Sequence, residues 1–98
     1  MPKFRTERND ANEIEAFLHG RHYRHLRTRH RADLVNIDSG PARVPVPCAR
    51  LRRVSVHLWR LEMPTHTGRW EITPFRGPLG ELLEILVDRF PWAIQYLE

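Results

Sequence analysis

The sequence is poor in cysteine and has no long apolar run. Cys48 is the only cysteine, so no internal disulfide can form, and a lone thiol is more typical of a reducing cytosol than of secretion. No apolar stretch approaches the roughly 20 residues that a membrane-spanning helix needs. The start, MPKFRTERND, lacks the apolar segment of a signal peptide. These absences predict a cytoplasmic protein with no membrane as a partner.

Lysine is almost missing, and acidic residues are scarce in the first part of the chain. All of the 16 basic residues except Lys3 are arginine, and the formal net charge is +4. Residues 1–60 hold 13 basic and 6 acidic residues, a net of +7, whereas residues 61–98 hold 3 and 6, a net of −3. Such asymmetry is typical of a surface that faces a polyanion. Arginines that only solvate the surface are the alternative explanation.

Motifs of the common enzyme classes are also missing. There is no phosphate-binding glycine loop and no C-x-x-C or H-E-x-x-H zinc pattern. Asp33 and Glu62 are candidates for the carboxylate pair of a metal-dependent nuclease, but Lys3 is the only lysine available beside them. We therefore expect a non-catalytic protein without a cofactor. Acid–base chemistry by His57 and His66 is the enzymatic alternative that the sequence leaves open.

The N-terminal part predicts an arm and a short helix. Residues 1–9 are expected to form a flexible arm. The segment NDANEIEAFLHG, residues 9–20, places apolar residues three and four apart, as in a helix. Asp10 is predicted to cap this helix with Glu13 in a capping box, and Gly20 to end it.

The middle of the chain predicts four strands in two hairpins. The expected strands cover residues 23–29, 34–37, 50–63 and 69–75, with a turn over residues 30–33. Residues 39–49 are expected to form a loop, because Pro41, Pro45 and Pro47 cannot donate hydrogen bonds to a sheet. The third strand has the strongest signal, since apolar residues alternate along it.

The C-terminal part predicts a helix over residues 77–90, which Pro91 ends. Its apolar stripe consists of Leu79, Leu82, Leu83, Leu86 and Phe90. The predicted fold is one α+β domain over residues 1–98, with elements in the order αββββα. It has a four-stranded antiparallel sheet with the C-terminal helix packed across one face. Residues 97–98 are expected to be a remnant of a cloning site and are given no role.

This order of elements resembles the αβββα order of the double-stranded RNA-binding domain. That family carries a lysine-rich motif at the start of its second helix. Here the same place reads PLGELLEILVD, and Glu81, Glu84 and Asp88 would repel phosphate. The chain also has an additional strand, so the resemblance is limited to the order of elements.

The segment HGRHYRHLRTRHR, residues 19–31, holds four histidines and five arginines without an acidic residue. His19, His22 and His25 are spaced three apart, and on a helix such neighbours can bind one zinc ion. On a strand the same spacing alternates faces and points them apart. These three histidines are therefore weak candidates for a metal site.

A basic row is the alternative interpretation of this segment. On a strand, His25, Arg27, Arg29 and Arg31 share one face, with alternate residues roughly 6.6 Å apart, while Leu26 faces the core. Such a row suits a phosphate backbone, and Tyr23 or Trp59 beside it would stack a base. The predicted nucleic-acid-binding residues are Arg24, Arg27, Arg29, Arg31, Arg50, Arg52 and Arg53.

A protein-interaction module is the second functional hypothesis. The ending FPWAIQYL is rich in apolar and aromatic residues. It is expected to pack on the domain, and Trp59, Trp70 and Trp92 are expected to lie in the core. If the ending is exposed, it predicts an interface with a protein partner. A second copy of the chain is the simplest such partner, and the sequence leaves open whether the protein is a monomer or a homodimer.

Overall fold

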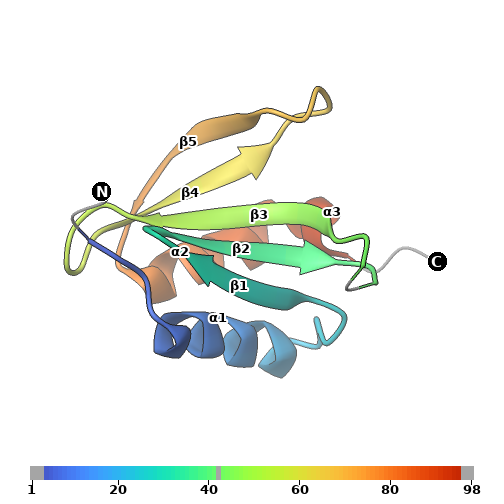
Figure 1. Cartoon of the computed structure of the whole chain (residues 1–98), viewed down its shortest axis with the longest axis horizontal. Helices are drawn as coiled ribbons and strands as arrows, with labels where there is room; N and C mark the ends of the chain where they lie inside the picture. Colours follow the sequence, from blue (N-terminus) through green and yellow to red (C-terminus); the bar gives the residue numbers. More distant parts are fainter. Residues whose placement is uncertain (1–3, 42, 96–98) are drawn as a thin grey trace.

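The computed structural model describes residues 4–41 and 43–95, which form a small α+β domain (Figure 1). The elements in chain order are α1 (Arg8–Gly20), β1 (Arg27–Arg31), β2 (Leu34–Ser39), β3 (Val46–Arg53), β4 (Trp59–Pro64), β5 (Trp70–Gly77), α2 (Leu79–Arg89) and α3 (Pro91–Ile94). The antiparallel sheet and the flanking helices were expected. The expected four strands and αββββα order were wrong, because the described chain has five strands and a short third helix.

The five strands form an antiparallel meander in the order β1-β2-β3-β4-β5. Helix α1 runs along the β1 edge, while α2 and α3 lie behind the sheet in the view of Figure 1. The outer edge of β1 is partly covered, because the Thr28 amide donates to the Glu15 carboxylate of α1 over 3.3 Å. The opposite edge strand, β5, contains Pro74, which cannot donate to a further strand.

The expected strand over residues 50–63 is two strands joined by a turn. The amides of Val54 and Ser55 both donate to the carbonyl of Leu58, over 2.8 and 3.1 Å, and reverse the chain. Apolar and polar residues alternate through this turn, so the sequence pattern did not reveal it.

The expected loop over residues 39–49 is also shorter than predicted, because β3 already begins at Val46. Pro47 is tolerated there next to a bulge, where the register shifts between Ile37 and Asp38. Ala42 of this loop lies outside the described residues.

The N-terminal residues lie against the first hairpin instead of forming a free arm. Thr6 is buried, and its hydroxyl donates to the carbonyls of Ala32 and Leu34 over 3.0 and 2.9 Å. Helix α1 is capped by Glu7 and Asp10, not by Asp10 and Glu13. Residues 1–3 of the expected arm and the expected remnant 97–98 lie outside the described part of the chain.

The first strand begins four residues later than expected. After α1 the chain turns at His22, whose φ is 75°, and the amide of Tyr23 donates to the carbonyl of Leu18 over 2.9 Å. This turn delays β1 to Arg27, and the hairpin closes with the two residues Ala32 and Asp33.

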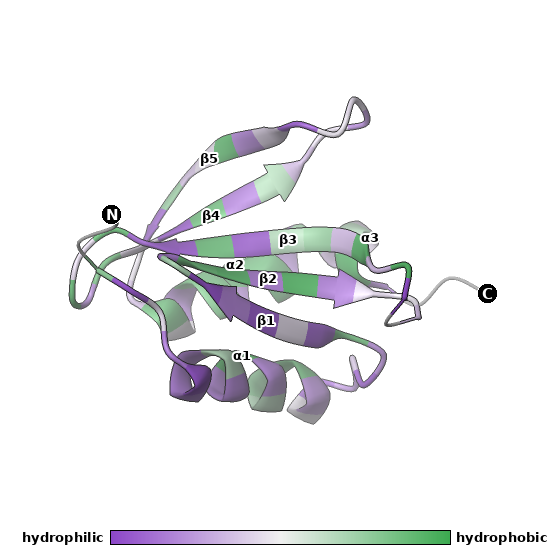
Figure 2. Cartoon of the chain, in the orientation of Figure 1, coloured by the Kyte–Doolittle hydropathy of each residue, from purple (hydrophilic) through white to green (hydrophobic). Residues whose placement is uncertain are grey.

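The hydrophobic core lies between the sheet and the helices. Polar and apolar residues alternate along β2, β3 and β4, as the colours of Figure 2 show. The fully buried side chains include Ile14, Leu18, Leu26, Val35, Ile37, Leu51, Leu61, Leu82, Leu86 and Ile94. Burying each of them stabilises the fold by about 1.5–3 kcal/mol. The expectation that Leu26 faces the core is confirmed. Since alternate residues point away from this core, the opposite face of the sheet receives the polar side chains.

Candidate functional site

The sheet register brings seven arginines to the face that no described helix covers. Residues directly opposite each other on antiparallel strands point to the same face, and so do alternate residues along a strand. By this rule one face carries Arg27, Arg29, Arg31, Arg50, Arg52, Arg60 and Arg76. We refer to these seven residues as the arginine face.

Two lines of paired residues cross this face at right angles to the strands. The first row, one residue from each strand in order, is Arg31, Leu34, Arg52, Arg60 and Arg76. The second row is Arg29, Asn36, Arg50, Glu62 and Ile72. At about 4.8 Å per strand interval, each row is roughly 19 Å long. The first row therefore places four cations across the whole width of the sheet.

Glu62 lies at the centre of the arginine face and is only 1% exposed. Its carboxylate accepts hydrogen bonds from the Nε atoms of Arg50 and Arg52, over 2.6 and 2.9 Å. It also accepts from the Nη2 of Arg60 over 2.8 Å. Burial alone would raise the pKa of Glu62, but the bonds from the three guanidinium groups outweigh burial and lower it. Glu62 is therefore ionised at neutral pH and holds three arginines in fixed positions.

The arginines around Glu62 keep N–H groups that Glu62 does not bind, and their side chains are 18–28% exposed. A guanidinium group has five N–H donors, and each of these arginines gives only one or two of them to Glu62. Arg52 also donates its Nη1 to Asp33 over 2.6 Å. Desolvation alone would lower the pKa of Arg52, but its bonds to Glu62 and Asp33 outweigh this and raise it.

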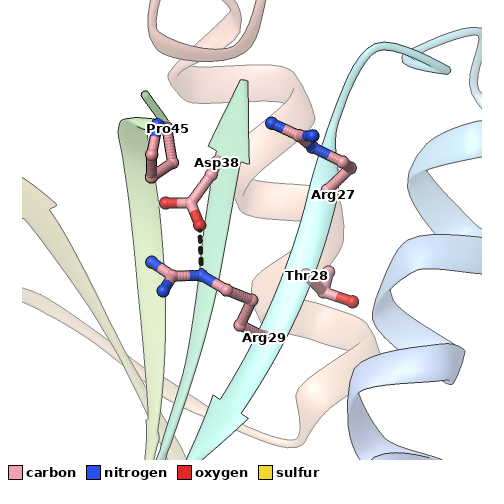
Figure 3. Close-up of a pocket in the computed structure, with 5 residues that line it drawn as sticks. All are labelled: Arg27, Thr28, Arg29, Asp38 and Pro45. Carbon is pink, nitrogen blue, oxygen red and sulfur yellow. Dashed lines mark hydrogen bonds and ion pairs between the residues drawn. The ribbon is translucent and has the colours of Figure 1, made fainter. Parts of the chain in front are cut away.

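A second carboxylate anchors the end of the face formed by β1 and β2. The Nε of Arg29 lies 2.8 Å from the carboxylate of Asp38, which is 3% exposed (Figure 3). The Arg29 side chain itself remains 63% exposed. Arg27 donates to the carbonyl of Gly40, and Pro45 completes a shallow pocket of about 230 Å³. Asp38 thus orients Arg29 while leaving most of its side chain in solvent.

Trp70 stacks against the arginine face instead of packing in the core. The guanidinium carbon of Arg50 lies 4.3 Å from the centre of the Trp70 ring, a cation–π distance. Trp70 is half-buried, and Ile72, two residues along β5 on the same face, is 58% exposed. The expected stacking residues lie elsewhere: Trp59 is buried, and Tyr23 packs on the core. Trp70 was expected in the core, so its position is a correction.

Five of the seven predicted binding arginines lie together on this face: Arg27, Arg29, Arg31, Arg50 and Arg52. Arg53 lies on the core side of β3, where it donates to the carbonyls of Arg5 and Val56 over 3.1 and 3.0 Å. Arg24 is exposed in the turn before β1 and is not part of the face.

Arg60 and Arg76 were missed by the sequence prediction, which named Glu62 only as a candidate nuclease carboxylate and not as the centre of a group of arginines. Arg60 and Glu62 are two residues apart on β4 and therefore share a face, but only the pairing of β4 with β3 shows that this is also the face of Arg50 and Arg52. Arg76 joins the face through its pairing with Arg60, next to a register shift between β4 and β5.

The three histidines proposed as weak metal ligands make separate contacts. The Nε2 of His19 hydrogen-bonds to the carbonyl of Leu26 over 2.9 Å, and that of His25 to the carbonyl of Ile94 over 2.7 Å. His22 lies in the turn after α1. Within residues 4–41 and 43–95, no three His, Cys, Asp or Glu side chains are grouped as metal ligands. His25 precedes β1 and does not join the arginine row that was expected to include it.

The carboxylate pair considered for a nuclease is occupied by an arginine. Arg52 lies between Asp33 and Glu62 and donates to both. A cation at this position repels a divalent metal ion, so this arrangement favours anion binding over metal-dependent hydrolysis.

Compared with known proteins, the chain matches no family model, no curated protein and no solved structure. No helix in the described part of the chain is long and apolar enough to span a membrane. Function is therefore argued from the arginine face itself.

Proposed function

We propose that this protein is a non-catalytic module that binds nucleic acid by contacting phosphates with the arginine face. The observation that carries the proposal is the first row, which places Arg31, Arg52, Arg60 and Arg76 across the sheet. A line of cations on an open face matches the line of charges along a phosphate backbone.

The charges of the face support this proposal. Seven arginines stand against three carboxylates, those of Asp33, Asp38 and Glu62, which leaves a local net charge of +4. Arg31 and Arg76, at the two ends of the first row, are exposed and form no ion pair within the described residues. Phosphates that contact these two arginines release the cations condensed on the nucleic acid, and this release drives association at low salt.

The size of the face is consistent with a short stretch of nucleic acid. The first row is roughly 19 Å long, which corresponds to about five or six nucleotides stacked at 3.4 Å per residue of one strand. Contacts of this kind give affinity with strong salt dependence and little choice of sequence.

Fluorescence anisotropy with labelled oligonucleotides at about 50 and 200 mM salt tests the proposal. The informative variant combines Arg31→Ala with Arg76→Ala. It should bind more weakly, and the slope of log K against log salt should become shallower by about 1.5 to 2. The matched control combines Arg24→Ala with Arg89→Ala, which removes the same charge from the turn before β1 and from α2. Equal losses in both variants would show that only net charge matters and would reject the arginine face as the site.

Exposed apolar residues near α3 favour a second candidate function, association with a protein or with a second copy. Trp92 was expected to pack in the core, but it is 65% exposed. It borders a groove of about 490 Å³, whose apolar lining includes Met63, Phe75 and Phe90. Large exposed aromatic side chains beside such a groove are typical of interfaces.

A further inference from the structure

We infer that the arginine face takes single-stranded nucleic acid, with unpaired bases stacking beside Trp70, Arg50 and Ile72. This inference rests on the proposed function and adds a ligand class to it. The starting observation is that Trp70 and Ile72 form an aromatic and apolar surface among the arginines. Phosphate contacts alone do not explain this surface.

The Trp70–Arg50 pair forms a platform that is fixed before any ligand arrives. Arg50 is held on one side by the Trp70 ring at 4.3 Å and on another by Glu62 at 2.6 Å. The Arg50 side chain is only 18% exposed, so a base stacks on the exposed part of the Trp70 ring that Arg50 supports. Because both contacts of Arg50 are already made, little side-chain entropy is lost when it does. Guanidinium planes and aromatic rings are the surfaces on which single-stranded ligands stack their bases.

Ile72 extends this platform along β5. It lies directly opposite Glu62 in the register, and it is 58% exposed on a face that is rich in arginine. An exposed aliphatic side chain beside three arginines suits a ligand that is both anionic and apolar. A nucleotide combines these properties, because its phosphate is charged and its base is flat and poorly hydrated.

The shape of the face favours a single strand over a duplex. The three described helices lie at the β1 edge or behind the sheet, so none projects from this face to enter a groove (Figure 1). Bases in a duplex are stacked on each other and offer only their edges, whereas unpaired bases offer their rings. Asn36, between Arg29 and Arg50 in the second row, adds an amide that can donate to and accept from a base edge.

The test compares three labelled ligands of equal length: an oligothymidine, an abasic strand and a duplex. The parent should bind the oligothymidine about tenfold more tightly than the abasic strand. Trp70→Leu removes the ring but keeps an apolar side chain. It should weaken oligothymidine binding about tenfold and leave abasic binding unchanged, because each stacked base contributes roughly that factor or more.

Two further variants separate stacking from folding. Trp70→Phe keeps a ring and should retain most of the oligothymidine affinity. Val56→Ala, in the turn between β3 and β4, removes an exposed apolar side chain that lies outside the platform and outside the groove that Ile72 lines, and it should bind all three ligands as the parent does. Thermal melting of each variant checks that the fold is intact.

The outcomes distinguish this inference from the function on which it rests. Equal binding of oligothymidine and abasic strand would overturn base stacking but leave phosphate binding standing. Tighter binding of the duplex would overturn the single-stranded assignment. No binding of any of the three ligands at low salt would overturn the proposed function and this inference together.

Discussion

Arg52 binds two carboxylates at once: its Nη1 lies 2.6 Å from Asp33, and its Nε lies 2.9 Å from Glu62. Asp33 belongs to the turn between β1 and β2, and Glu62 belongs to β4. Arg52, on β3, therefore connects the first hairpin to the second half of the sheet. The residue at the centre of the first row thus has a structural role in addition to its place in the candidate site.

Replacing Arg52 by Met should lower the free energy of unfolding by about 2 kcal/mol, because buried Glu62 loses one donor and Asp33 loses its partner. Methionine keeps most of the apolar stem, so the loss reports mainly on the charge contacts. Urea denaturation measures the change. Arg31→Met is the control on the same face, and it should change stability by no more than about 0.5 kcal/mol. Similar losses in both variants would contradict the connecting role of Arg52.

The ionised Glu62 side chain should make the free energy of unfolding depend on pH in the acid range. The pKa of Glu62 is lower in the folded protein than its ordinary value of 4.5. Its ionised form therefore stabilises the fold fully above that ordinary value, and this contribution is lost as the pH falls through the folded pKa. Glu62→Gln should be less stable than the parent at pH 7 by about 2–3 kcal/mol.

The measurement for Glu62 is the difference in unfolding free energy between parent and Glu62→Gln at several pH values. The difference should shrink below pH 4.5, because the parent then loses the charge that the variant already lacks. Comparing the two proteins cancels the titration of the other carboxylates. A difference that stays constant down to pH 2.5 or so would show that the Glu62 charge does not stabilise the fold.

The sequence predicted the polar side of the fold better than its strand boundaries. Five arginines of the face were identified because alternation along a strand is a local property. The turn at residues 54–58 was missed because its apolar and polar residues alternate like those of a strand. Arg76 was missed because its place depends on pairing with Arg60 across a shifted register. Pairing of distant segments is decided by packing of the whole sheet, which no local pattern records.

The environment of Glu62 could not be predicted from its own neighbours in the sequence. The arginines that hold it come from two strands, and Trp70 reaches Arg50 from a third. The sequence offered Glu62 as a possible metal ligand beside Asp33. The same two carboxylates instead share Arg52, which only the register of β2, β3 and β4 could show.

Replacing Ala32 in the first hairpin by glycine should stabilise the fold. It lies in the two-residue turn between β1 and β2 with a φ of 54°, a conformation that favours glycine. Ala32→Gly should raise the free energy of unfolding by about 0.5–1 kcal/mol, because strain is relieved while the carbonyl that Thr6 contacts is retained. Thermal melting measures the change.

Ala16→Gly, at an exposed position inside α1, is the control and should lower stability by about 1 kcal/mol. Lower stability in Ala32→Gly would contradict strain at this turn.

The second candidate function makes a prediction about Trp92. If the groove beside Trp92 is an interface between two copies, the parent should elute as a dimer, and Trp92→Ala should elute as a monomer with its melting curve otherwise unchanged. The reason is that a central aromatic side chain contributes about 2 kcal/mol or more to the binding free energy of such an interface.

Light scattering at several protein concentrations measures the mass. Val56→Ala is the control, because Val56 is exposed but lies outside the groove. A parent that remains monomeric at high concentration would reject self-association through this groove and would leave the arginine face as the better-supported binding surface.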